Sequence, residues 1–111
     1  MSPAQFRKLA LSLPEAVESQ HMGHPDFRVG GKIFATLWPD GTWGMAKLAP
    51  EAQADFCVDE PEVFEPWPGG WGKLGCTRIT LKKAPIASVR RALTVAWLRI
   101  APRRLHAQLK K

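Results

Sequence analysis

Cationic side chains on a glycine-rich segment, and on the strand expected after it, have the clearest chemical potential in this sequence. Lys73 lies within Gly70–Gly75, and Arg78 and Lys82 follow in a run that alternates apolar and polar residues. On one face of a strand, Arg78 and Lys82 would stand about 13 Å apart, at roughly 3.3 Å per residue. Cations in such a row contact the phosphates of a nucleic acid and give salt-dependent affinity without reading base sequence.

A second hairpin is expected to extend this surface. Arg28 and Lys32 flank the Gly30-Gly31 turn, and Trp71 lies between two glycines next to Lys73. If the two loops project on one side of the sheet, the five cations form one basic patch. Trp71 has two interpretations: an exposed indole would stack on a base, whereas a buried one would cover the sheet. The predicted nucleic-acid site consists of Arg28, Lys32, Trp71, Lys73, Arg78 and Lys82.

The distribution of charge along the chain also indicates an anionic partner. The 111 residues have a formal net charge of +6. Residues 1–65 contain five basic and all ten acidic side chains, whereas residues 66–111 contain eleven basic side chains and no acidic one. Such a segment is typical of proteins that meet phosphates, anionic surfaces or acidic proteins. The alternative is that the folded chain interleaves the acidic residues of the segment 55–65 with these arginines.

The sequence has no recognisable catalytic or metal-binding motif. His21 and His24 lie near Asp26, but they lack zinc-site spacing, and residues three apart on an extended segment point to opposite faces. His24 is therefore interpreted as a hydrogen-bonded structural residue. Gly30-Gly31-Lys32 lacks the other positions of a phosphate loop, and no Gly-x-Ser-x-Gly elbow is present. Neither an enzymatic activity nor a metal or cofactor is expected.

Length and composition indicate a single domain over residues 1–111. With 45% hydrophobic residues, five Trp and five Phe, the chain can bury a modest core. No apolar run approaches the roughly 20 residues that span a bilayer, and the amino terminus has no apolar signal region. We therefore expect a cytoplasmic protein without a membrane partner. Cys57 and Cys76 are expected to be reduced and at least partly buried thiols.

Two helices are predicted at the ends of the domain. Ser2 and Gln5 have the spacing of a capping box, and the helix that they start should end at Pro14. A final helix is predicted from about Pro85 to Ala101, followed by a turn docked through Leu105 and Leu109. Its expected core stripe consists of Ile86, Val89, Leu93, Trp97 and Ile100.

Extended runs predict an antiparallel meander between these helices. The runs Phe27–Val29, Lys32–Trp38 and Trp43–Leu48 are separated by glycine-containing turns. Both faces of Lys32–Trp38 are apolar, so that strand should be central, and Trp38, Trp43 and Trp97 are expected in the core. A short helix is predicted from Pro50 to Val58, then a loop from 59 to 70. The final strand should carry Arg78, Thr80 and Lys82 on one face.

Two blocks of the sequence resemble the small bacterial proteins of the MmcQ/YjbR-like family. They are His24–Ala35, HPDFRVGGKIFA, and Gly70–Leu81, GWGKLGCTRITL, and the resemblance extends in order over nearly the whole chain. It implies an α+β domain with a topology likened to bacterial frataxin and a role in DNA binding. At Cys76 relatives often carry an aromatic residue, so a stacking role at that position is not implied here. Iron binding like that of frataxin is not expected, because the first helix lacks an acidic ridge.

The sequence therefore favours a non-enzymatic protein that binds nucleic acid, expected to be double-stranded DNA, through the basic loop-and-strand surface. The alternative is a protein-interaction module. In that case the basic carboxy-terminal half binds an acidic protein partner, or the acidic loop 55–65 binds a basic one. A third hypothesis is a small-molecule binder with an aromatic pocket between the sheet and the last helix.

Overall fold

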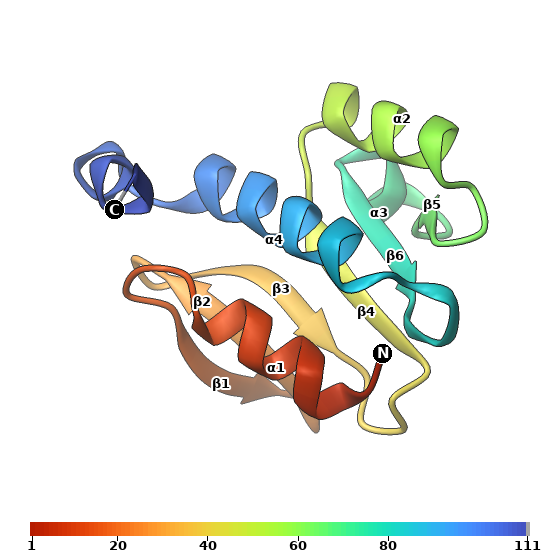
Figure 1. The fold of residues 1–111 in the computed structure, drawn as a ribbon, viewed down its shortest axis with the longest axis horizontal. Coiled ribbons are helices and arrows are strands. Elements are labelled where there is room, and N and C mark those ends of the chain that lie inside the picture. Colours follow the sequence, from red (N-terminus) through yellow and green to blue (C-terminus); the bar gives the residue numbers. More distant parts are fainter. Residues whose placement is uncertain (111) are drawn as a thin grey trace.

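The structure, a computed structural model that describes residues 1–110, contains a six-stranded antiparallel sheet with helices α1, α2 and α4 on one face (Figure 1). The strand order across the sheet is β1-β2-β3-β4-β6-β5. The strands are β1 (Val17–His21), β2 (His24–Val29), β3 (Lys32–Leu37), β4 (Trp43–Lys47), β5 (Phe64–Pro66) and β6 (Cys76–Thr80). The helices are α1 (Pro3–Leu11), α2 (Pro50–Asp59), α3 (Gly70–Lys73) and α4 (Ile86–Ile100), with 3-10 segments η1 (Leu81–Lys83) and η2 (Arg103–Lys110). The predicted α+β fold, an antiparallel sheet packed by amino-terminal and carboxy-terminal helices, is confirmed.

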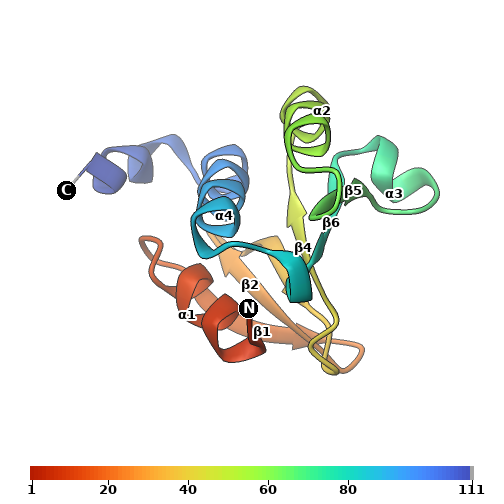
Figure 2. The same cartoon turned by 45° about the vertical axis from the view of Figure 1, so that its right-hand side comes forward.

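Helix α1 begins with the predicted capping box. The Ser2 hydroxyl accepts from the Gln5 backbone N–H at 3.1 Å, and the Gln5 side chain accepts from the Ser2 N–H at 2.8 Å. Both bonds satisfy amide groups that the first turn of a helix leaves without partners. Phe6 and Ala10 are fully buried on the inner side of the helix. α1 thus packs on the sheet beside α4, as Figure 2 shows.

Helix α4 lies across β3 and β4 and provides much of the core. Val89, Leu93 and Trp97 of the predicted stripe are buried, but Ile86 is 43% exposed, so that part of the prediction is wrong. The buried face instead includes Ser88, Ala92 and Ala96, whose small side chains let the helix approach the sheet closely. Leu105 of η2 docks as predicted, fully buried. No helix within residues 1–110 is long and apolar enough to cross a membrane.

The strands β2, β3 and β4 form the predicted meander, and β3 lies in the interior of the sheet as expected. Strands β1 and β5 were not predicted. All five side chains of β1 are exposed or half-buried, so no apolar alternation marks the strand. β5 has only three residues and lies within the segment 59–70, which was predicted to be a loop. Pairing with β6 organises this short edge strand, and local propensity does not reveal such a partner.

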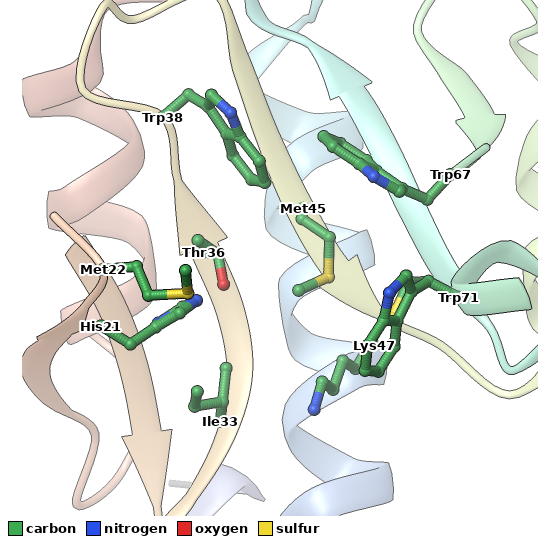
Figure 3. Close-up of a pocket in the computed structure, with 10 residues that line it drawn as sticks. His21, Met22, Ile33, Thr36, Trp38, Met45, Lys47, Trp67 and Trp71 are labelled. Carbon is green, nitrogen blue, oxygen red and sulfur yellow. The ribbon is translucent and has the colours of Figure 1, made fainter. Parts of the chain in front are cut away.

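The helices leave the opposite face of the sheet uncovered, and this changes the position of two tryptophans. Trp97 is fully buried as predicted, but Trp38 is half-buried on the uncovered face (Figure 3), and the half-buried Trp43 contacts Trp67 there, so the assignment of both to the core is wrong. The contact between sheet and last helix is packed by buried residues such as Phe34 and Leu93. The aromatic hollow expected there lies instead on the uncovered face (Figure 3).

The end of β6 also differs from the prediction. The strand stops at Thr80, and Leu81–Lys83 form the 3-10 turn η1 because the chain bends there toward α4. Lys82 therefore does not share a strand face with Arg78. The side chains of Thr77 and Ile79 are buried as the alternation predicted.

Candidate functional site

The uncovered face of the sheet contains a groove of about 380 Å³ (Figure 3). Successive residues of a strand point to opposite faces, so every second side chain of β3 and β4 reaches this side. Thr36 and Met45 are cross-strand partners and form its floor. The β1–β2 turn contributes one wall, with His21 and Met22, while Trp71 stands on the opposite wall.

A row of aromatic rings in tilted and edge-to-face contact closes one end of the groove. The ring centroids of His24 and Trp38 are 4.7 Å apart, and those of Trp38 and Trp67 are 4.6 Å apart. Trp43 meets Trp67 edge to face at 6.1 Å. The Nδ1 atom of His24 is buried without a hydrogen-bond partner in residues 1–110, so the hydrogen bond expected there is not formed. The ring instead packs at a tilt against Trp38.

A buried ion cluster lies beside the groove. The Asp26 carboxylate is fully buried and accepts from Arg28 Nε at 2.8 Å and Arg28 Nη2 at 3.1 Å. Its Oδ2 atom also lies 2.7 Å from His21 Nδ1. The Arg28 guanidinium, and then the His21 ring, hold the pKa of Asp26 below its ordinary value of 3.8, although burial acts in the opposite direction. An ionised Asp26 therefore orients both neighbours.

The other end of the groove is open and basic. A second hollow of about 320 Å³ adjoins the groove and shares Lys47 and Trp71 with it. Arg99 lines this hollow and donates from Nη1 to the Leu48 carbonyl at 2.6 Å. That bond holds a guanidinium beside the ammonium of Lys47. The two hollows together form a continuous site with an aromatic end and a cationic end.

Two predicted cations, Lys32 and Lys73, lie at this basic end, and a third, Arg28, is neutralised by a carboxylate. β3 and β6 both pair antiparallel with β4, so these two strands start at the same end of the sheet. Lys32 at the start of β3 and Lys73 just before β6 therefore both lie at the basic end. Arg28 is paired with Asp26. Trp71 is 64% exposed, which decides between its two interpretations in favour of an accessible indole.

The other two predicted cations lie elsewhere. Arg78 is paired with Glu65 and its guanidinium lies 4.7 Å from the centroid of the Trp43 ring. Lys82 follows the end of β6, whereas Lys73 precedes its start, so the two lysines lie at opposite ends of the sheet. The five predicted cations therefore do not form the single patch that the sequence suggested.

The interleaving of charges left open by the sequence occurs at two places. Glu65 pairs with Arg78, and Glu60 lies 3.7 Å from Arg91. Part of the acidic segment 55–65 is therefore interleaved with arginines. Within residues 1–110, no group of three His, Cys, Asp or Glu side chains is placed to hold a metal ion.

Among the site residues that sequence reasoning missed are Lys47, Arg99 and His21. Lys47 follows Trp43 and Met45 at spacing two, and that alternation could have placed it on their face. Arg99 lies outside the apolar stripe of α4, but its position beside Lys47 depends on how the helix crosses the sheet. His21 had no usable signal, because the strand β1 that carries it was not recognised.

Comparison with known proteins identifies a family and shows a similar fold. The sequence model of the YjbR family matches residues 11–99. Among solved structures, the fold is similar to that of Deinococcus radiodurans protein DR2400, which contains the domain DUF419. The two have a TM-score of 0.75 and 16% sequence identity, over 98% of this chain and 88% of the other. No curated protein matches the sequence. At this identity, the likeness to the solved structure concerns the fold.

Proposed function

Since this chain belongs to the YjbR family, whose model spans residues 11–99, we propose that its uncovered sheet face binds nucleic acid, with unpaired bases on the aromatic side chains. The phosphates of the same strand lie at the basic end of the groove. The observation that carries the proposal is the continuity of the aromatic groove with the hollow lined by Lys47 and Arg99.

The aromatic part of the site supports contacts with bases. Trp71 is 64% exposed and stands on a wall of the groove. A large indole at the surface loses contact with water when a base stacks on it, and such stacking contributes about 1–3 kcal/mol per base. Every base has a π face, so this contribution does not require a particular sequence.

The cationic part supports contacts with phosphates. Lys47 and Arg99 line the second hollow, and Lys32 and Lys73 lie at the same end of the sheet. The Pro102 ring lies next to Gly30 in the β2–β3 turn, so the start of η2, with Arg103 and Arg104, is also near this end. Clustered cations attract a nucleic acid backbone and release its counterions on binding.

An unpaired strand fits this geometry better than the duplex expected from the sequence. The indole of Trp71 and the groove floor, with Thr36 and Met45, face the inside of the groove. Bases that are stacked on one another inside a duplex do not reach such a surface. Two of the cations expected to follow a duplex backbone, Arg28 and Arg78, are already paired with carboxylates. A single-stranded nucleic acid is thus the preferred ligand in this proposal.

The first prediction tests this with fluorescence anisotropy of labelled single strands and matched duplexes over a range of salt concentrations. Trp71→Ala should weaken single-strand binding roughly tenfold, because it removes one stacking platform. Lys47→Glu should also weaken binding and flatten the salt dependence, by about 0.7 in the logarithmic slope for each lost phosphate contact.

The matched control is Lys82→Glu, which makes the same charge change at the opposite end of the sheet. It should leave the affinity close to that of the wild type. Equal losses in Lys47→Glu and Lys82→Glu would attribute binding to net charge alone. Tighter binding of the duplex than of the single strand would overturn the proposed mode.

A second candidate function is supported by the acidic surface of α2. Glu51, Asp55 and Asp59 are exposed and recur at every fourth residue, so they lie along one side of the helix. This surface suits a basic protein partner, the interaction module considered above. Asp55→Lys should abolish retention of such a partner from nuclease-treated lysate and leave nucleic acid binding intact. Retention that persists in this variant would remove the helix as the contact surface.

The proposal includes a non-catalytic, cytoplasmic role. Cys76 lines the groove and would be the natural nucleophile there, but burial raises the pKa of its thiol. The thiol form is a poor nucleophile, so the geometry supports binding more than covalent chemistry. The free thiols of Cys57 and Cys76 suit a reducing compartment.

A further inference from the structure

We infer that the groove is a pocket for a single nucleobase, and that His21 selects bases by accepting a hydrogen bond from an N–H group on the ring edge. This inference rests on the proposed function, because it names the part of the nucleic acid that the groove holds. It also assigns a specificity-determining role to a residue outside the basic surface.

The dimensions and lining of the groove suit one planar ring system. Its volume of about 380 Å³ lies near the lower end of the range for small-ligand sites, roughly 300–1,000 Å³. The side chains of Met45 and Trp71 provide apolar contacts to the faces and edges of a ring. Met22, 93% exposed at the β1–β2 turn, extends the opposite wall. Exposed apolar side chains on both rims indicate a surface that a ligand covers.

Asp26 determines which nitrogen of His21 is available to that ligand. The Asp26 carboxylate is ionised, fully buried and only 2.7 Å from His21 Nδ1, so Nδ1 carries the proton and donates to it. In the neutral ring, the remaining Nε2 atom is then a hydrogen-bond acceptor. The side chain of His21 is 41% exposed and lines the groove, which makes this acceptor accessible.

Arg28 makes this arrangement rigid. Its Nε and Nη2 atoms donate to both oxygens of Asp26, at 2.8 and 3.1 Å. A carboxylate held in this way cannot rotate away from His21. The pairs Ser19–Asp26 and Asp26–Thr36 in the strand register place Asp26 between β1 and the groove floor. The acceptor is therefore preorganised before a ligand arrives, which lowers the entropic cost of binding.

Thr36 provides a second polar group in the same pocket. Its hydroxyl oxygen points toward the groove in Figure 3, and the residue is 2% exposed on the floor. A hydroxyl both donates and accepts, so it can satisfy a ring nitrogen next to the N–H group that His21 recognises. The amino group and N1 of adenine have this arrangement. Lys47 lies toward the open end, where the phosphate of the same nucleotide would be neutralised.

The second prediction follows from this polar arrangement and uses free mononucleotides. Adenosine 5′-monophosphate and purine riboside 5′-monophosphate, which lacks the amino group, are titrated separately while tryptophan fluorescence is recorded. The wild type should bind the adenine nucleotide about tenfold more tightly, because the analogue leaves the His21 acceptor without a donor. His21→Ala should bind both ligands equally, with the affinity for the analogue unchanged.

Two further variants separate recognition from packing. His21→Gln keeps an acceptor oxygen at this position and should restore part of the preference for the adenine nucleotide. Met22→Ala removes apolar area from the same wall and should weaken both ligands to the same extent. Circular dichroism of each variant establishes that the fold is retained.

The outcomes distinguish this inference from the proposed function. Equal affinities of the wild type for the two nucleotides, or an undiminished preference in His21→Ala, would overturn the role of His21. Binding of single-stranded oligonucleotides without measurable binding of either mononucleotide would overturn the single-base pocket and leave the proposed function standing. Selective mononucleotide binding by a protein that binds no oligonucleotide would support the pocket and overturn binding of nucleic acid strands.

Discussion

Gly75→Ala is expected to lower the free energy of unfolding by about 3 kcal/mol, since backbone strain and overpacking each cost about 1–3 kcal/mol. Gly75 has a φ of +105°, which side chains other than glycine rarely adopt. A Cβ at this position would lie only 1.7 Å from the Leu48 carbonyl oxygen. The backbone of Leu48 has to shift to make room, because no flexible side chain can absorb the contact.

This clash would also reach the basic end of the groove. The Leu48 N–H donates to the Gly75 carbonyl at 3.0 Å, and the Leu48 carbonyl accepts from Arg99 at 2.6 Å. A displaced Leu48 therefore loosens the link between β4 and β6 and the position of Arg99. We expect the fraction of Gly75→Ala that folds to bind single strands less tightly than the wild type.

Urea denaturation of Gly75→Ala and Gly70→Ala provides the test. Gly70 starts α3 with a negative φ, and a Cβ there meets no atom within 4 Å. The same substitution at Gly70 should be neutral or slightly stabilising, because alanine favours helices over glycine. Equal stability of the two variants would mean that the contact between Gly75 and Leu48 is not as close as described.

Asp26→Asn is expected to lower the free energy of unfolding by about 2 kcal/mol at neutral pH, in the range of hydrogen bonds to a charged group, because Asp26 is buried while Arg28 and His21 are partly exposed. Asp26 is fully buried and accepts hydrogen bonds from Arg28 and His21. The amide is almost the same size, so packing is preserved while the charge is lost. Its NH2 group cannot accept a hydrogen bond, which leaves one donor of Arg28 or His21 without its partner.

The effect of Asp26→Asn should depend on pH. The pKa of Asp26 is held below 3.8 in the folded protein, chiefly by the hydrogen bonds from Arg28. A carboxyl group with a lowered pKa in the folded state stabilises the protein fully at pH values above its ordinary pKa. This contribution is lost as the pH falls through the pKa of the folded state. The stability difference between wild type and Asp26→Asn should therefore be full near neutrality and shrink below pH 3.8.

Chemical denaturation at a series of pH values measures this difference. Asp55→Asn is the matched control, because Asp55 is exposed on α2 and the substitution is the same. Its stability should follow that of the wild type across the series. A difference between wild type and Asp26→Asn that stays constant into acid would show that the carboxylate charge is not what stabilises the cluster.

Several elements of the fold follow from short-range features of the sequence. The capping box of Ser2 and Gln5 marks the start of α1, and Gly30-Gly31 makes the turn between β2 and β3, with φ values of 60° and 80°. These features act over a few residues and therefore do not depend on the rest of the fold. β1 and β5 could not be predicted in this way, because their signal is the partner strand rather than their own side chains.

The candidate site was predicted only in part. Of the residues expected to contact nucleic acid, Trp71 borders the basic end of the groove, Lys32 and Lys73 lie at the same end of the sheet, and Lys82 is at the opposite end. The pairing of Arg78 with Glu65 joins residues 13 positions apart and has no local signature. The closeness of Lys47 and Arg99 likewise depends on the path of α4 across the sheet.

The sequence alone was enough to predict the class of fold, the start of α1, the bounds of α4 to within one residue, the glycine turn and the excess of positive charge in residues 66–111, whereas α1 ends at Leu11, before the predicted Pro14. Each depends on composition or on neighbours a few positions away. Which face of the sheet the helices cover depends on tertiary packing, and so does the position of Trp38 on the wall of a groove and of Trp43 against Trp67 rather than in the core. Alternation shows that β3 has two apolar faces, but the packing of α1 and α4 determines which of them stays open.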